Sequence, residues 1–502
     1  MEQNQTLHSP RFMRESLETE LDTKVMSAAF EAIKAAEKLS APSSTDATNA
    51  VATTLTSVRK AAFKALQKSG LPHTHSEDFT FVRLSEFMPF LVESRLIEKT
   101  LEDSDKSTLT ATKSDAEVEP FIYAEAKSNY LVIENGIWNR ESSKIDSNIC
   151  VTALASNTME LNPHFLRGLE NEPDGTASLA ALFATKPMHI QFSAGYNSTA
   201  PLQILHLSTS HESSNESVSA PSAQALQPTL IFIEVAKNVE AKILVRSEIF
   251  ADSTEPKTNE KKSNPQFINL NTQVYLNENA SLKIFEASKP DQHIHFQKLS
   301  AQLSRNSRFK SLAAQSGSTL TRKSYAIDLQ GEGAEAEINS ASVLMGNRQA
   351  HQHILIKHLV PNCNSKQHFK SVAADSAKSS VDGTIFVAEN ANGTNAHQLI
   401  NNLMLSDTAR TDSKPQLKIY SDDVKCAHGS TTGKLDAAQQ FYLESRGLNA
   451  EQAKSLLTLA FVAEIVEKCD LDLSHFRSQL EHNLLDALKL KLPTDVQIKT
   501  DN

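Results

Sequence analysis

The sequence predicts a mainly β protein with helical segments at both ends, and three observations support this fold class. In the first hundred residues, apolar side chains recur three or four positions apart, which is the spacing of amphipathic helices. From about residue 123 onward, short β-rich runs bounded by Gly, Asn, Asp and Ser replace that spacing. Helical spacing then returns near the C-terminus. The predicted domains are an N-terminal helical domain with a linker at 1–120, a β core at 121–433 and a C-terminal helical domain at 434–502.

The N-terminal domain is expected to hold three helices followed by a polar linker. Each of the first two places its apolar side chains on one face, which must be buried against another element. A Ser/Thr/Pro-rich segment separates these two helices, and Gly70 with Pro72 ends the second. In chain order the segments are helix 17–36, separator 41–48, helix 51–66, helix 87–101 and linker 103–120.

The β core is predicted from short runs that alternate or stay apolar over four to six residues. Between residues 325 and 420 they recur at roughly fifteen-residue steps with no helical stripe between them, which favours a stacked all-β architecture. A sandwich and a solenoid β-helix both fit this recurrence. Two polar segments, 208–228 and 251–265, are expected to be surface loops. The runs are 130–133, 202–207, 230–235, 242–246, 326–329, 353–356, 384–387, 399–403 and 417–420.

The C-terminal domain is expected to contain three helices with recognisable ends. Asp436, with Gln439 three residues later, is a variant capping box for the first helix, and Gly447 closes it. Asn449 can cap the second helix. The third helix carries Leu at 473, 480, 484 and 488.

Composition excludes several classes of protein. The formal net charge is -10, so the chain has no basic excess of the kind that binds nucleic acid. Its four cysteines are far apart with no C-x-x-C pair, which is typical of a reducing compartment. The N-terminus shows no secretion signal, and the most apolar helix-like stretch, 456–466, is too short to cross a bilayer. A cytoplasmic protein without nucleic-acid or membrane partners is therefore expected.

Common catalytic motifs are missing from the sequence. It has no P-loop, no G-x-S-x-G and no H-E-x-x-H, and Gly331 to Ala334 is interpreted as a turn between strands. A polysaccharide-cleaving β-helix enzyme is an alternative, but it would need carboxylates clustered in a groove. No strong acidic cluster lies on one run, and Trp138 is the only tryptophan available for sugar stacking.

Histidine is the one unusual count, at seventeen. His351 with His353, and His293 with His295, stand two apart, so each pair would share one face of a strand. Such pairs can bind a transition metal, as in a metallochaperone. A solvated strand face is the preferred interpretation, and the same holds for two further histidines, His358 and His368.

The segment from Asp422 to Gly429 is the densest in potential ligands. If it is extended, Cys426 and His428 point to the same side, close enough to contact one metal ion or one sulfur species. A thiolate and a neutral imidazole are both good ligands for iron or zinc. A single Cys-x-His is not a complete metal site, so further ligands would have to come from elsewhere.

At these residues the sequence resembles the SufB/SufD family of iron–sulfur cluster assembly scaffolds, strongly over 322–466. The long run NLMLSDTARTDSKPQLKIYSDDVKCAHG at 402–429 resembles the family signature. The resemblance favours SufD, because Gly429 follows His428 where SufB-like chains tend to carry Glu, and FYLESRG at 441–447 is SufD-like. Two departures are Phe79, where Trp is usual, and Ser421, where Ala is common. Other matching parts are TGKLD at 432–436, DLQGEGA at 328–334, 351–358, Pro361 and Gly383.

The resemblance implies a right-handed parallel β-helix core flanked by N-terminal and C-terminal α-helical domains. It implies a scaffold subunit, not an enzyme, that pairs with a SufB-like subunit while its C-terminal domain holds a SufC-like ATPase. His428 would lie at the heterodimer interface and share a metal with a partner cysteine, with Cys426 nearby. No cofactor would be stably bound by this chain alone, only a transient iron–sulfur cluster at that interface. Without SufB a homodimer could form, and a SufB-like cluster-holding scaffold is the nearest alternative.

Overall fold

The computed structural model describes residues 25–28, 30, 33–34, 54–73, 76–82, 115–154, 161–209, 226–250, 266–289 and 291–487. The expected helix at 87–101, the separator at 41–48, the loop at 251–265 and most of the linker lie outside these residues. Residues 115–120 of the linker are described and form helical turns, contrary to the prediction. The polar segment at 208–228 is partly strand, because strands occupy its first two and last three residues.

The strands, in chain order, are β1 Tyr130–Glu134, β2 Ile137–Lys144, β3 Ile149–Ala153, β4 Met188–Phe192, β5 Leu202–Thr209, β6 Leu226–Val235, β7 Glu240–Phe250, β8 Phe267–Leu276, β9 Ser281–Ala287, β10 Ile294–Leu303, β11 Arg308–Gln315, β12 Leu320–Leu329, β13 Glu335–Leu344, β14 Gln349–His358, β15 Asn364–Ala373, β16 Lys378–Val387, β17 Thr394–Met404, β18 Arg410–Ile419 and β19 Val424–Gly433. The helices are α2 Thr54–Ser69, η1 Glu77–Phe79, α5 Asp115–Val118, η2 Glu119–Phe121, η3 Ala124–Ala126, α6 Pro163–Glu170, α7 Gly175–Phe183, α8 Ala437–Ser445, α9 Ala450–Val466 and α10 Ser474–Ala487.

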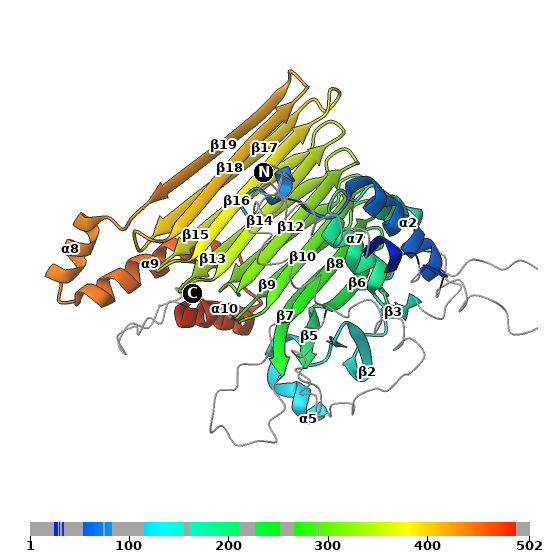
Figure 1. Ribbon diagram of the computed structural model, residues 1–502, viewed down its shortest axis with the longest axis horizontal. Helices are drawn as coiled ribbons and strands as arrows, with labels where there is room; N and C mark the ends of the chain where they lie inside the picture. Colours follow the sequence, from blue (N-terminus) through cyan, green and yellow to red (C-terminus); the bar gives the residue numbers. More distant parts are fainter. Residues whose placement is uncertain are drawn as a thin grey trace, which may run out of the picture.

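The strands form a parallel β-solenoid (Figure 1), which confirms the predicted β-helix and excludes the sandwich. From β4 onward, successive strands alternate between two sheets, so each coil contributes one strand to each sheet. The ten-stranded sheet runs β19-β17-β15-β13-β11-β9-β7-β5-β1-β2, and the nine-stranded sheet runs β18-β16-β14-β12-β10-β8-β6-β4-β3. The pairings are parallel except β1 with β2 and β3 with β4. The fifteen-residue step in the sequence therefore corresponds to half a coil.

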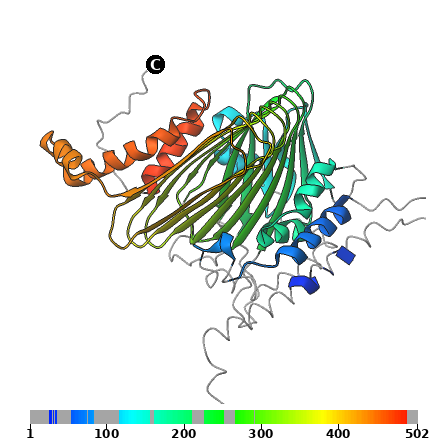
Figure 2. The ribbon, with the colours of Figure 1, turned by 90° about the horizontal axis from the view of Figure 1, so that it is seen from above.

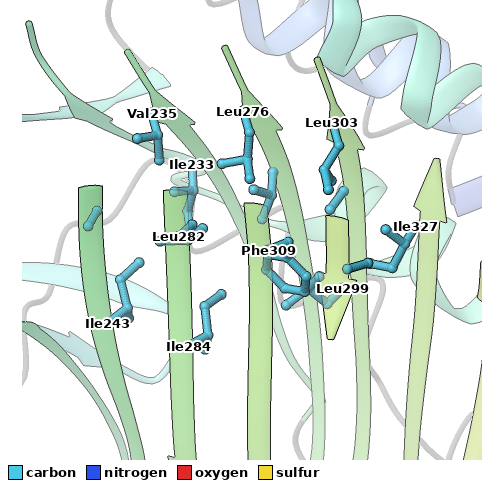
Figure 3. Close-up of a cluster of buried hydrophobic side chains, with 14 of the residues drawn as sticks. Ile233, Val235, Ile243, Leu276, Leu282, Ile284, Leu299, Leu303, Phe309 and Ile327 are labelled. Carbon is cyan, nitrogen blue, oxygen red and sulfur yellow. The ribbon is translucent and has the colours of Figure 1, made fainter. Parts of the chain in front are cut away.

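The space between the two sheets is filled by apolar side chains in register. Val235, Leu276, Leu303 and Leu329 follow one another on adjacent strands and form one such column. Figure 3 shows side chains of both sheets converging on this core. Each of these side chains is fully buried, and burying a Leu or Val contributes about 1.5–3 kcal/mol. The columns therefore hold the coils together from within.

One corner of the solenoid is built from residues with a left-handed backbone. Asn238, Asn279 and Asn306 have φ of 60°, 57° and 54° on successive coils. Their amides form a ladder: Asn279 Nδ2 donates to Asn238 Oδ1 at 2.9 Å, and Asn306 Nδ2 donates to Asn279 Oδ1 at 3.2 Å. Asparagine tolerates this conformation because its short side chain can hydrogen-bond locally. Gly333 continues the corner, and a Cβ there would lie 2.4 Å from Asn306 Oδ1.

Helices α2, α6 and α7 cover the outer face of the nine-stranded sheet near its first coils (Figure 2). α6 and α7 fall inside the range assigned to the β core and were not predicted. The residues of α7 are all buried, so it carries no polar face and no amphipathic period for the sequence to reveal. Helix α2 and the described helical residues between 25 and 34 agree with the predicted first two helices.

The C-terminal helices α9 and α10 pack on the outer face of the ten-stranded sheet, on the side opposite the N-terminal helices (Figure 2). Asp436 and Asn449 cap their helices as predicted, but Asp436 forms no capping box with Gln439. Asn449 forms a capping box with Gln452, and Asp436 accepts a hydrogen bond from the Ala438 backbone N at 2.8 Å. Gly447 ends α8 with a φ of 97°. Helix α8 extends beyond the sheet and has no buried residue.

Asp174 joins the N-terminal helices to the solenoid. Its carboxylate caps α7 by accepting from the Thr176 backbone N at 3.0 Å, and it also binds Arg322 Nη1 of β12 at 2.5 Å. Burial alone would raise the pKa of Asp174, but Arg322 and Lys298 hold that pKa well below its ordinary value. The Arg322 guanidinium also lies 3.9 Å from the centre of the Phe79 ring. One buried ion pair therefore fixes both η1 and α7 on the sheet.

Replacing Asp174 by Asn should destabilise the protein by about 3–5 kcal/mol, because Arg322 would remain buried without its counter-ion. A folded-state pKa below the unfolded value gives stability that is present above the ordinary Asp pKa and is lost as pH falls through the folded pKa. The difference in free energy of unfolding between the native protein and Asp174→Asn, measured by urea unfolding, should therefore become smaller at acid pH. Asp486→Asn, at an exposed ion pair, is the control and should change little. A loss below about 1 kcal/mol at neutral pH would contradict this role.

Candidate functional site at the open end of the solenoid

The solenoid ends in an uncovered pair of strands, β18 and β19. Each is the last strand of its sheet and pairs on one side only among the described residues. Neither contains a buried residue, in contrast to the strands of the coils before them. Leu399, Ile419 and Tyr420 are exposed by 41%, 37% and 62% at this end. Unpaired strand edges and exposed apolar groups are the features by which another chain adds to a sheet.

Cys426 and His428 both lie on β19, on the same face of the strand. Cys426 pairs with Ala396 and packs against the interior cluster that includes Ile385 and Val387, so it points into the solenoid. His428 stands two residues further on and pairs with Gln398, so it shares that inward face. Its side chain is exposed because no further coil covers it. The structure therefore confirms that the two predicted residues share one side.

Cys426 and His428 differ in how easily each could bind a metal ion in the free chain. Burial raises the pKa of the Cys426 thiol, and a hydrogen bond from the Ala396 backbone opposes this effect only in part. At neutral pH the thiol form is thus favoured, which is the weaker nucleophile and ligand. The His428 ring is open to solvent and can meet a group brought by another chain. In the isolated chain His428 is the more accessible of the two.

The two residues that precede His428 in its interior column are both glutamines. Ile338, Gln367, Gln398 and His428 occupy successive strands in register. Gln398 Nε2 donates to Gln367 Oε1 at 2.8 Å. Sequence inspection did not select Gln398, because its neighbour in space is thirty residues away and only the register brings the two together.

The six other histidines singled out in the sequence do not form a solvated strand face, and that expectation is wrong; His353 is half-buried and lies 3.4 Å from Asp78 Oδ1. His293, His295, His351, His358 and His368 are all buried. They have polar partners within the fold; His351 Nδ1, for example, lies 2.7 Å from Ser380 Oγ, and His358 Nε2 lies 2.9 Å from Ser365 Oγ. In the part of the chain that the structure describes, no group of three or more His, Cys, Asp or Glu residues could hold a metal ion. The fold thus gives these histidines structural contacts.

The turn predicted at Gly331 to Ala334 is confirmed between β12 and β13. A Cβ at Gly331 would lie 1.9 Å from the Arg305 backbone N, so the glycine permits close coil-to-coil contact.

A second exposed surface lies on α8, where Phe441 and Tyr442 are exposed by 71% and 57%. Neither ring belongs to the solenoid core.

Comparison with known proteins identifies the family of this chain. A model of the SufBD core domain of the SUF iron–sulfur cluster assembly system matches residues 218–461, a range that includes both candidate residues and the whole of α8. An iron–sulfur cluster assembly SufBD family protein of Synechocystis is 27% identical over 426 residues, covering 83% of this chain and 88% of that protein. The chain belongs to the SufB/SufD family.

Two further SufB/SufD relatives match shorter parts. The iron–sulfur cluster assembly protein SufD of Escherichia coli is 38% identical over 151 residues, which is 30% of this chain and 36% of that protein. A SufBD family protein of Mycobacterium leprae is 30% identical over 193 residues, covering 37% of this chain and 49% of that protein. The family assignment gives no support to a polysaccharide-cleaving enzyme. Among the helices that the structure describes, none combines the length and apolar character needed to cross a bilayer.

Replacing His428 by Ala should leave the SufB/SufD fold almost unchanged in stability. The ring is exposed and lies on the terminal strand, and such substitutions usually stay within about 0.5 kcal/mol. Phe369→Ala, deep in the interior, is the comparison and should cost about 3–5 kcal/mol. Urea unfolding of the two variants measures both effects. A loss above about 1 kcal/mol for His428→Ala would mean that the ring has a structural role.

Proposed function

We propose that this chain is a SufD-type subunit that pairs with a SufB-like subunit through the open end of the solenoid and binds a SufC-like ATPase through its C-terminal domain. The observation that carries the proposal is the placement of His428. It faces inward on the terminal strand β19, which has one unpaired edge, and is exposed to a group supplied by a partner. By its resemblance to SufD, His428 would help to bind the nascent iron–sulfur cluster, together with a cysteine of the partner.

The open end has the properties of a strand-pairing interface. β18 and β19 offer free backbone groups along ten residues each. A homologous solenoid could continue both sheets across this edge, with main-chain hydrogen bonds supplying affinity. The exposed Leu399, Ile419 and Tyr420 would supply the apolar area of the interface. Pairing would enclose His428 between the two chains.

The chemistry required of His428 is modest. A neutral imidazole nitrogen can ligate iron, and a thiolate from the partner would supply a soft second ligand. The cluster is the cargo of this site and leaves it, so the chain needs no complete ligand set. Nothing in this role makes the subunit an enzyme, since nucleotide hydrolysis belongs to the ATPase partner. The proposed compartment is the reducing cytoplasm, in keeping with four free cysteines.

The distribution of cysteines favours a SufD role over a SufB-like one. A scaffold that holds a cluster by itself needs several thiolates at one place. Here Cys426 is the only cysteine at the open end, while Cys363 and Cys469 are buried elsewhere and Cys150 lies on β3. Burial raises the pKa of Cys469 to about 12 and raises that of Cys363 as well. These two thiols suit a packing role.

The ATPase contact is proposed for α8, which refines the assignment to residues 434–502. The apolar sides of α9 and α10 are already buried against the ten-stranded sheet. Helix α8 keeps Phe441 and Tyr442 exposed, and large aromatic side chains are common anchors of protein interfaces. Deleting the whole domain would uncover the sheet, so point substitutions in α8 are the cleaner test.

In a reconstituted three-subunit complex, His428→Ala should lower the iron and sulfide bound after anaerobic assembly several-fold, while all subunits still co-purify. Cys426→Ser should have a smaller effect, because its thiol is partly buried. Lys425→Ala is the matched control, since it is exposed on the opposite face of the same strand and should leave the yield unchanged. Undiminished cluster content with His428→Ala would refute the proposed role of the ring.

Replacing Phe441 and Tyr442 together by Ala should weaken binding of the ATPase subunit at least tenfold, or about 1.4 kcal/mol, without loss of pairing with the SufB-like subunit. Both rings are exposed, so the fold should stay intact. Leu471→Ala serves as control, because this leucine is 83% exposed but lies between α9 and α10. The measurement is the affinity of the ATPase subunit for each surface-immobilised variant, obtained by titration. Equal affinities for the double variant and the native chain would rule out α8 as the contact.

A further inference from the structure

The interior of the solenoid changes character along one column toward the open end. Leu202, Ile243 and Ile284 form its aliphatic start on β5, β7 and β9. Ser311 and Ile338 follow, and Gln367 and Gln398 then precede His428. Two consecutive buried amides beneath an exposed imidazole are costly to bury, and they contribute no apolar packing. Their position calls for a reason beyond filling the core.

The side chain of Gln398 is enclosed by Gly383 and Gln367. Gly383 faces it from the other sheet, and a Cβ on that glycine would lie 2.0 Å from Gln398 Nε2. Its side chain is 2% exposed, and Nε2 donates to Gln367 Oε1 at 2.8 Å. The amide is thus fixed at one end by Gln367 and given room by Gly383.

The other end of the amide is unsatisfied. Gln398 Oε1 is buried and has no hydrogen-bond partner in the structure. A buried acceptor without a partner costs about 1–3 kcal/mol, so native proteins rarely leave one unless something else completes it. The nearest position along the column belongs to His428, on a strand that lies about 4.8 Å away in a parallel sheet.

We propose that Gln398 is a positioning residue for His428: when a partner covers the open end, Gln398 Oε1 accepts a hydrogen bond from one ring N–H of His428. The other ring nitrogen is then unprotonated and faces the partner. Histidines that bind metals commonly donate their second ring nitrogen to such an acceptor, which fixes both the tautomer and the ring plane. This inference rests on the proposed function of His428 and names the residue that prepares it.

In the free chain Gln398 and His428 are already neighbours along the column, and the partner completes the contact. In the free chain His428 is exposed, and solvent competes for its ring nitrogens. Covering the open end excludes that water, so the orphaned Gln398 oxygen and the imidazole N–H become each other's best partner. Docking of the partner and orientation of the ligand are thereby coupled.

The first test measures His428 in the full-length chain without any cluster. The rate at which diethyl pyrocarbonate modifies the neutral ring, followed by peptide mass spectrometry from pH 5.5 to 8.5, gives its titration midpoint. Gln398→Glu places a carboxylate one strand away and should raise that midpoint by about one pH unit. The native bond, in which Gln398 donates to Gln367 Oε1, is lost, but a half-turn of the Gln367 amide lets its Nε2, which has no partner now, donate to the new carboxylate.

Gln352→Glu is the matched control. Gln352 is also an interior glutamine, 2% exposed, with an unpartnered Oε1, but its column runs through Val381 and Ser413 and does not reach His428. It should leave the midpoint where it is. An unchanged midpoint in Gln398→Glu, or an equal rise in both variants, would overturn the inference. This readout does not involve cluster formation, so it is independent of the proposed function.

The second test covers the case in which a buried glutamate prevents folding. Gln398→Met and Gln352→Met keep the side-chain length and remove the amide without adding charge. In the reconstituted complex, the Gln398 variant should assemble at least threefold less cluster than the Gln352 variant at a matched thermal midpoint, and Gln398→Glu should restore part of the loss where it folds. Equal yields from the two methionine variants would show that Gln398 only packs, even if His428→Ala abolishes assembly.

Discussion

The in-register hydrogen-bond ladder between successive coils governs the whole molecule. Because parallel strands pair residue by residue, each inward side chain stacks on the one before it, and the columns build a continuous core. The same rule leaves the final coil without a neighbour, so β18 and β19 end with free backbone groups. The structural regularity that stabilises the middle therefore creates the exposed edge at which Cys426 and His428 lie. The in-register pairing of the coils therefore accounts both for the stability of the core and for the exposed site.

Much of the fold could be predicted from local signals. The strand runs, the caps at Asp436 and Asn449 and the glycine turn at Gly331 follow from residue types at fixed spacing. Helix α7 could not be predicted, because a helix buried on all sides has no polar period. Burial of the histidines was also missed: His368 lies under α9, beside Glu464, and His358 continues the interior column of Leu329, and no local pattern reveals either placement. Gln398 required the register, which no local pattern encodes.

The solenoid interior also carries charge. Lys323 and Glu286 form an ion pair between the two sheets, with Tyr325 and Ser311 joined nearby at 3.2 Å. Burial would lower the pKa of Lys323, but Glu286 and Tyr325 raise it above the ordinary value. Such pairs add little net stability over apolar packing, yet they penalise any slip in strand register that would separate them. Polar interior groups near the middle and at the end thus favour a single alignment of the coils.

The asparagine corner divides the solenoid into a rigid edge and a permissive one. At Asn238, Asn279, Asn306 and Asn362 the chain passes from the nine-stranded to the ten-stranded sheet, and backbone and amide bonds tie each turn to the next. One inserted residue there would break bonds to two coils at once. The return crossings that the structure describes carry no asparagine ladder, although later ones are tied by other bonds, such as that from Gly346 N to Asp375 Oδ2 at 2.9 Å. The two longest connections on that side are 210–225, from β5 to β6, and 251–265, from β7 to β8. Length variation during evolution, and engineered insertions of tags or recognition loops, should therefore be tolerated at the β5–β6 and β7–β8 crossings and excluded at the asparagine corner.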